Sequence, residues 1–182
     1  MTRLLLWLLG GALLGGIVHL ASILILPSLA SQDAYTRLSP LAPVNTVVPL
    51  PPPGPGASVM PFMDPAFLMA ACRYDLSRGP LKFSMPTGPA YTAVSFYTRT
   101  NVAFYAINDR SAGGRAIELD LMTTEQRNDL PGDEEITAAD RLIVESPSAT
   151  GLILIKALVA EAGMLPVARG TLAAARCRPG GN

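Results

Sequence analysis

The sequence predicts an α+β protein in which one N-terminal transmembrane helix and a proline-rich linker precede a small domain with an antiparallel sheet and flanking helices. Three observations support this fold class: an uncharged apolar run near the N-terminus, a cluster of prolines after it, and a remainder in which helix-like and strand-like patterns follow one another. We place the membrane anchor or signal segment at residues 1–30, the linker at 31–61, the domain at 62–178 and a disordered tail at 179–182.

The apolar run, residues 4–26, holds 23 residues without a charge, and its only strongly polar member is His19. A helix of that length measures roughly 35 Å, enough to cross a hydrocarbon core of about 30 Å. We interpret it as an uncleaved anchor, because the core of a signal peptide is usually only about 7 to 15 residues long. A cleaved signal is the alternative, since residues 28–30 (SLA) resemble a cleavage site. Arg3 precedes the run and Asp33 is the first charge after it, so the positive-inside rule predicts a cytoplasmic N-terminus and a periplasmic or extracellular domain.

One face of the apolar run carries small residues and the histidine. Gly11, Gly15 and His19 are spaced four residues apart and share this face of the helix. Glycines allow a second helix to approach closely, and a polar side chain can form a hydrogen bond across such a contact. We predict a helix-pairing face here, although glycine is also common in membrane helices that do not pair.

The predicted linker is rich in proline. Eight of the 17 prolines lie between Pro40 and Pro61. Proline fixes φ and lacks an amide donor, so this stretch is expected to be extended and semi-rigid. A spacer that holds the domain off the membrane is the favoured interpretation, and a docking peptide for a proline-reading module is the alternative.

The remaining chain alternates between helical and strand-like segments. Asp64-Pro65 is typical of a helix start and predicts a helix that ends near Arg73 or Asp75. A capping box at Thr123 predicts a short helix. Apolar periodicity predicts the other elements, namely strands at 90–98, 102–108, 116–121, 141–145 and 151–159, the last one buried, and a closing helix at 165–176.

The strand pair 90–98 and 102–108 suggests a candidate surface. A three-residue loop would place Asn101 in the left-handed conformation, with Phe96 opposite Phe104 and Val94 opposite Ala106. In that register, three tyrosines share the other face of the pair and form a possible ligand or partner surface. These residues are Tyr91, Tyr97 and Tyr105.

Two cysteines frame the domain: Cys72 in the predicted first helix and Cys177 after the last one. Compartments outside the cytoplasm oxidise thiols, so we predict a disulfide between them, with two unpaired thiols as the alternative. No metal site is expected, since zinc requires more ligands than two thiols.

Catalytic patterns are scarce. His19 is the only histidine and lies in the apolar run, which excludes a serine–histidine or cysteine–histidine nucleophile in the domain. A serine–lysine dyad from Lys82 or Lys156 with Ser84 or Ser146 is conceivable, but no spacing favours it, and we expect no catalytic residues and no cofactor. The 14 basic and 14 acidic residues balance, so nucleic acid is not an expected partner.

Several strings carry a resemblance to a known family: PVNTVVPLP, MDPAFLMAACRYDLS, AYTAVSFYTR, IELDLMTTEQRNDLP and the final AARC. The sequence resembles a bacterial family of predicted single-span integral membrane proteins, the domain-of-unknown-function family number twelve fifty-four. The resemblance implies a single membrane span and no known activity, and with the charge pattern around the apolar run we expect the inner membrane of a bacterium. It is also similar to the N-terminal part of longer envelope proteins in which a second domain follows.

The sequence therefore suggests a non-catalytic envelope protein that is anchored in the lipid bilayer. Its expected partner is a second membrane-tethered envelope protein, which the resemblance favours, or another copy of itself. A periplasmic domain that binds a small ligand or acts as an enzyme is the alternative.

Overall fold

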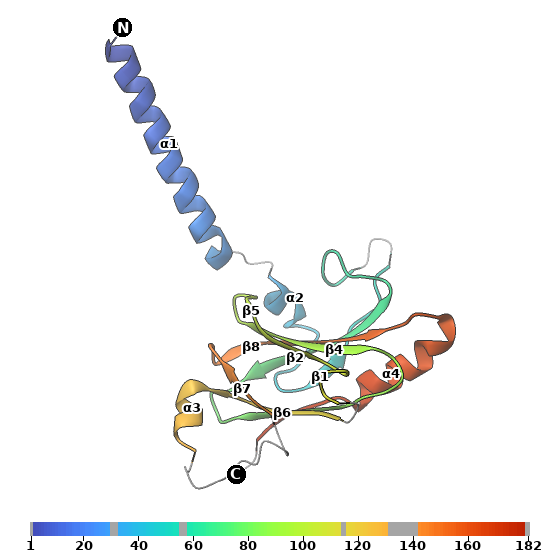
Figure 1. Cartoon of the computed structure of the whole chain (residues 1–182). Coiled ribbons are helices and arrows are strands. Elements are labelled where there is room, and N and C mark those ends of the chain that lie inside the picture. The colour runs from blue at the N-terminus through green and yellow to red at the C-terminus, as the bar shows by residue number, and fades with distance from the viewer. Residues whose placement is uncertain (1, 30–32, 55–57, 114–115, 131–141, 181–182) are drawn as a thin grey trace. The chain divides into compact units, whose positions relative to one another are not determined.

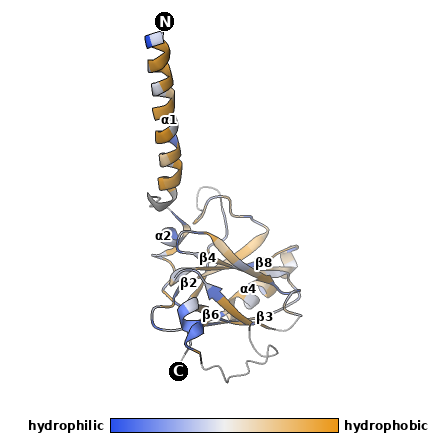
Figure 2. Ribbon diagram, turned by 60° about the vertical axis from the view of Figure 1, so that its left-hand side comes forward, coloured by the Kyte–Doolittle hydropathy of each residue, from blue (hydrophilic) through white to orange (hydrophobic). Residues whose placement is uncertain are grey.

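The computed structural model of the 182-residue chain describes residues 2–29, 33–54, 58–113, 116–130 and 142–180 (Figure 1). The chain forms two compact units, Met1–Asp33 and Ala34–Asn182. The first unit contains helix α1 (Thr2–Leu29), whose colouring in Figure 2 is almost entirely hydrophobic. By length and composition its segment Thr2–Leu26 is able to cross a membrane, as the uncharged run predicts.

The second unit consists of two sheets with short helices, and the predicted α+β class is confirmed. The five-stranded sheet has the order β1-β2-β8-β4-β5, with strands β1 (Val47–Pro49), β2 (Phe67–Asp75), β8 (Thr150–Leu158), β4 (Thr92–Thr98) and β5 (Ala103–Asn108). The four-stranded sheet has the order β7-β6-β3-β9, with strands β7 (Leu142–Ser146), β6 (Ala116–Thr123), β3 (Leu81–Pro86) and β9 (Arg176–Pro179). All pairs are antiparallel except β6 with β7, which is parallel.

An inner core lies between the two sheets. Phe83 of β3 meets Phe96 of β4 edge-on, with 6.1 Å between the ring centroids. A disulfide joins Cys72 of β2 to Cys177 of β9, the pair that the sequence predicts. Helix α4 (Leu165–Ala174) follows the one-turn helix η1 (Ala162–Met164) and adds Leu172 to this core.

The first predicted element of the domain is wrong, because residues 67–75 form strand β2 and not a helix. All nine residues of β2 are paired with β8. Alternate side chains enter two different apolar clusters, so both faces of the strand are buried. The side chain of Asp64 accepts a hydrogen bond from the Ala66 amide in the turn before the strand. Tertiary burial thus overrides the local helical signal.

The predicted linker also differs from the structure, since the domain begins near residue 34 and not near 62. Leu38 of helix α2 (Ala34–Leu38) and Leu50 are buried against Met69, Leu152 and their neighbours on the outer face of the five-stranded sheet. Apart from strand β1, which belongs to the sheet, residues 34–54 and 58–63 therefore form a cap on that face and not a free spacer. Prolines suit this cap because β1 is an edge strand.

Most of the other predicted elements are present, but the closing helix ends at Ala174 and residues 176–179 form strand β9. Strand β8 is buried on both faces, as its continuous apolar run predicts. Helix α3 (Thr124–Asn128) begins with the capping box, in which the Thr123 hydroxyl accepts from the Gln126 amide. The chain from 131 to 141 lies outside the described residues. At the other end, Gly180 donates to the Pro80 carbonyl at 2.6 Å, so the predicted tail is paired at its start.

Candidate functional site

The outer face of the four-stranded sheet carries charged side chains in two rows. Register places Asp120 of β6 beside Lys82 of β3, and Lys82 beside Arg178 of β9. The next row joins Glu118, Ser84 and Arg176 in the same order. Because successive residues of a strand point to opposite faces, the residues between them enter the inner core.

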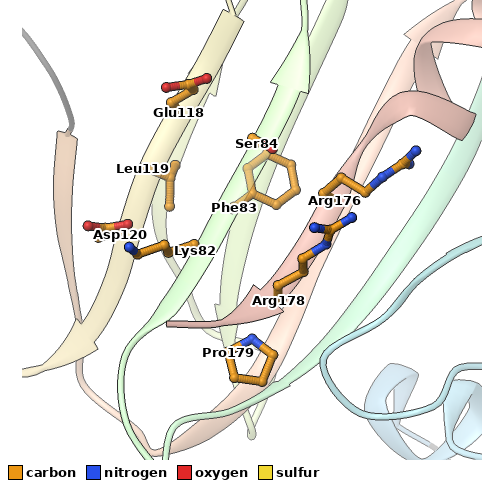
Figure 3. A pocket seen from close by; sticks show the side chains of 9 residues that line it. All are labelled: Lys82, Phe83, Ser84, Glu118, Leu119, Asp120, Arg176, Arg178 and Pro179. Atoms are coloured by element: carbon orange, nitrogen blue, oxygen red, sulfur yellow. The ribbon is translucent and has the colours of Figure 1, made fainter. Parts of the chain in front are cut away.

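These two rows border a shallow depression of about 290 Å³ (Figure 3). The Lys82 side chain extends toward Asp120, and the Arg178 side chain projects from the neighbouring strand β9. The depression is lined by Lys82, Phe83, Ser84, Glu118, Leu119, Asp120, Arg176, Arg178 and Pro179. We call the outward-facing members of this set the charged face. They are Lys82, Ser84, Glu118, Asp120, Arg176 and Arg178.

The charged face separates its acids from its bases. Both acids lie on β6, whereas the bases lie on β3 and β9. Lys82 is directly opposite Arg178, and like charges in such a cross-strand pair repel each other. Neither cation makes an ion pair within the part of the chain that the structure describes. On its other side Lys82 lies opposite Asp120, toward which its side chain extends (Figure 3), so Arg178 is the base of this row that lies farther from the acids.

Asp120 adds a second unsatisfied feature. Its Oδ1 atom is buried and has no hydrogen-bond partner in the described structure. A buried acceptor without a donor is costly and calls for an explanation. Because this atom is buried, a molecule bound on the charged face does not reach it unless the Asp120 side chain rearranges. Arg176, in contrast, already donates to the Ala173 carbonyl at 2.6 Å and caps the end of α4.

The structure brings together one of the serine–lysine combinations that the sequence suggests and separates the others. Lys82 and Ser84 share the charged face. Lys156 lies in the other sheet, and Ser146 is bonded at 2.9 Å to the hydroxyl of Tyr74. Lys82 is exposed.

The predicted tyrosine surface is not formed. Phe96 pairs with Tyr105 and Val94 with Ile107, one residue away from the predicted register, because a bulge follows Phe96. Tyr105 consequently packs on Phe96 in the inner core, with 5.8 Å between the ring centroids, whereas Tyr97 packs on the capped outer face. Tyr91 precedes β4, and its carbonyl accepts from Leu158. Asn101 does adopt the predicted left-handed conformation, with a φ of 63°.

Tyr74 is a buried polar residue that the sequence analysis missed. Its hydroxyl bonds to Ser146 of β7 and, at 3.1 Å, to the Tyr97 carbonyl of β4, so it connects the two sheets. Burial raises the pKa of Tyr74, and the bonds to Ser146 and Ser148 partly offset that rise. Gly151 makes room for this network, because a Cβ there would overlap the Tyr74 hydroxyl.

A second aromatic side chain stabilises the contact between the cap and the rest of the domain. Two guanidinium groups lie over the ring of Tyr35 in α2, Arg73 at 4.5 Å and Arg99 at 4.2 Å from its centroid. Arg73 also donates to the carbonyls of Ser39 and Ala42. These contacts hold the segment after α1 on the domain.

Other predicted sites remain as expectations. On α1 a Cβ at Gly11 or Gly15 would meet no atom within 4 Å, so the face they share with His19 is uncovered, and helix pairing stays a prediction. Among the described residues, no group of three or more metal-ligating side chains is present.

Comparison with protein families decides where the chain belongs. A family model described as "Protein of unknown function (DUF1254)" matches residues 44–179. The chain belongs to this family. The match begins inside the cap and ends in β9, so the DUF1254 domain includes both sheets and the disulfide. No curated protein sequence matches the chain.

The chain is similar to solved structures. The VPA0106 protein from Vibrio parahaemolyticus is similar over 81% of this chain, with a TM-score of 0.59 and 15% identity. An uncharacterized protein from Burkholderia cenocepacia also matches over 81% of the chain, with a TM-score of 0.48 and 14% identity. The chain spans about a third of the length of these proteins, 34% and 37% respectively. At such identities the VPA0106 match shows the fold alone.

Proposed function

We propose that this DUF1254 protein is a membrane-anchored, non-catalytic component of the bacterial cell envelope whose domain binds a partner envelope protein through the charged face. The observation that carries the proposal is the charge order on the open sheet. Acids and bases occupy different strands, and two cations, Lys82 and Arg178, lie opposite each other. Complementary charges on a partner would pair with these groups and set its orientation.

A protein fits this surface better than a small molecule. Small-ligand sites are concave and bury most of the ligand. The charged face is instead a shallow depression on three neighbouring strands, and it presents both signs of charge. Polar rows of this kind are typical of an interface rim, where electrostatics select the partner.

The envelope location is supported by two features. Helix α1 is long and apolar enough to span a bilayer. The disulfide between Cys72 and Cys177 suits a domain on the oxidising side of a membrane. Together they favour an inner-membrane anchor with the domain in the periplasm or outside the cell.

The size of the VPA0106 protein also supports an assembly. In that protein the same fold occupies about a third of a longer chain, so there it is joined to additional protein. We infer that a surface of the DUF1254 domain of this chain also contacts another protein. The charged face, on the outer side of the four-stranded sheet, is the surface that we assign to this contact.

Site-specific photo-cross-linking in membranes of the native host tests the proposal. A photoreactive residue at Arg178 should give one discrete cross-linked protein, and Lys82→Glu should abolish that product. The same residue at Arg169, which is exposed on α4, is the matched control and should give none. Equal products at both positions, or none at Arg178, would contradict the proposal. Recovery of the protein as a monomer with a bound small molecule would favour a ligand-binding domain instead.

A further inference from the structure

The cap on the five-stranded sheet almost lacks charge. Arg37 is the only charged residue between positions 34 and 63, and the acids Asp33 and Asp64 lie just outside this range. An average soluble protein has about 25% charged residues, and most of them are exposed to water. A segment that covers an entire sheet face with a single charge therefore suits contact with an apolar medium better than contact with water alone.

The exposed apolar side chains of the domain gather on the same side. Among the described residues of the domain, the four most exposed large apolar side chains lie on the cap or on the turn beside it. They are Phe62, which is fully exposed, Val102 (60%), Leu41 (44%) and Val44 (43%). The turn with Val102 is next to α2, because Arg99 of this turn donates to the Thr36 hydroxyl.

Phe62 is the clearest member of this group. Its φ of 58° lies in the left-handed region, which a bulky residue rarely adopts. A phenylalanine that is fully exposed and also held in a costly backbone conformation indicates a function and not a packing role. Aromatic and aliphatic side chains in such positions are typical of proteins that bind the boundary between lipid and water.

The chain between α1 and the cap is short. Residues 30–33 are all that separate Leu29, at the end of α1, from Ala34, at the start of α2. Five residue steps extend at most about 18 Å, which is less than the diameter of a small domain, about 30 Å. Since α1 is the proposed membrane anchor, the cap is the first part of the domain outside the lipid.

We propose, on the basis of the membrane anchor in the proposed function, that the cap is a lipid-binding surface that lies on the leaflet from which α1 emerges, with Phe62 inserted among the phospholipids. Arg37 and Arg99 suit this position, because a guanidinium group binds phosphate oxygens in pairs. The absence of acids between positions 34 and 63 suits it as well, because carboxylates and anionic phospholipids repel each other.

The tether favours lipid as the occupant over a separate protein. Because α1 would hold the cap near the leaflet, binding of the cap is an intramolecular event with a high effective concentration of lipid. A few scattered apolar side chains and two arginines are sufficient under that condition. A separate protein partner would require a larger and better-packed surface.

Lipid binding by the cap would also orient the domain. The cap covers the outer face of the five-stranded sheet, and the charged face lies on the outer side of the four-stranded sheet, across the inner core. Figure 1 shows α2 and β6 on opposite sides of β2 and β8. With the cap on the lipid, the charged face points away from the membrane, where a partner protein is able to reach it.

Fluorescence quenching of the full-length chain in lipid nanodiscs tests the proposal. The nanodiscs contain phosphatidylethanolamine and phosphatidylglycerol, and some of the acyl chains carry a nitroxide quencher. One variant has an environment-sensitive fluorophore on Phe62→Cys. The matched control has it on Asn128→Cys, an exposed position of α3 beside the four-stranded sheet. Quenching should be about twofold or more stronger at position 62 than at position 128.

A second set of variants tests the side chains that hold the cap on the lipid. With the fluorophore on Leu41→Cys, Phe62→Ser combined with Arg37→Glu should remove most of the quenching. Both substituted side chains are exposed, so the fold should be retained, which circular dichroism verifies. The matched control is Val167→Ser combined with Arg169→Glu, which makes the same kinds of change on α4 and should leave the quenching unchanged.

The outcomes separate this proposal from the membrane anchor. In a chain that is inserted in the nanodisc, equal quenching at positions 62 and 128 would overturn the lipid-binding cap alone. Quenching at Leu41→Cys that the double substitution on the cap does not reduce would do the same. A photoreactive residue at position 62 in native membranes should give phospholipid adducts, and one discrete protein adduct would assign the cap to a protein partner instead. A chain that does not enter nanodiscs would refute the anchor and the lipid-binding cap together.

Discussion

Removal of the disulfide should be the most damaging small change to the domain. Cys72 and Cys177 are 105 residues apart, so their bond restricts a long loop in the unfolded chain. On the chain-entropy model a loop of that length corresponds to about 16 cal/mol/K, or about 4.7 kcal/mol at 25 °C. We expect Cys72→Ala with Cys177→Ala to lower the free energy of unfolding by about 4 to 5 kcal/mol, a large share of the total for a domain.

Urea unfolding followed by circular dichroism measures this loss. The double variant should unfold at a lower urea concentration and with a larger slope, because its unfolded chain exposes more surface. Reductant supplies the matched control: it should lower the wild-type midpoint and leave the double variant unchanged. Two results would refute the reasoning that the cross-link restricts the unfolded chain. One is a loss of less than about 1 kcal/mol in the free energy of unfolding. The other is a wild-type urea midpoint that reductant does not change.

Four further predictions concern the core, the cap and the sheet contacts. Leu38→Ala should lower stability by about 2 to 5 kcal/mol in urea unfolding, since Leu38 is fully buried, whereas a free linker would show no change. Gly151→Ala should cost about 1 to 3 kcal/mol and lower the melting temperature, because its Cβ overlaps the Tyr74 hydroxyl. Thr123→Ala should cost about 1 kcal/mol through loss of the cap of α3, measured in the same way. Stability should fall as pH rises above the ordinary tyrosine pKa of 10.0, because the unfolded phenol of Tyr74 releases its proton while the buried one retains it. A melting series against pH should show this fall in the wild type and a smaller one in Tyr74→Phe.

Elements with a strong local signal could be predicted from the sequence. The uncharged run predicted α1, the capping box at Thr123 predicted α3, and the continuous apolar run predicted the buried strand β8. Asn101 indicated the turn between β4 and β5. In each case neighbouring residues alone determine the structure.

Strand β2 shows where local reasoning fails. Phe67, Leu68, Ala71 and Cys72 have helical spacing, yet the strand buries both of its faces, so its apolar residues need not alternate. The cap was missed for a related reason. Its prolines suggested an exposed spacer, and only the completed sheet provides the surface on which Leu38 and Leu50 are buried.

The charged face could have been anticipated in part. Leu81, Phe83 and Met85 alternate with Lys82 and Ser84, which is the pattern of a half-exposed strand. No local signal places β3 between β6 and β9, because these strands are far apart along the chain. The tyrosine surface was wrong because one bulged residue after Phe96 moves Tyr105 to the opposite face from Tyr97.

The central claim is that the chain is anchored in a membrane with its domain on the oxidising side. Thiol trapping in intact cells tests it most directly: acid quenches thiol–disulfide exchange, and after fractionation a maleimide of large mass labels the free thiols, with and without prior reduction. We predict a full-length chain in carbonate-washed membranes whose Cys72 and Cys177 take up label only after reduction. A soluble chain with both thiols labelled before reduction would contradict the account.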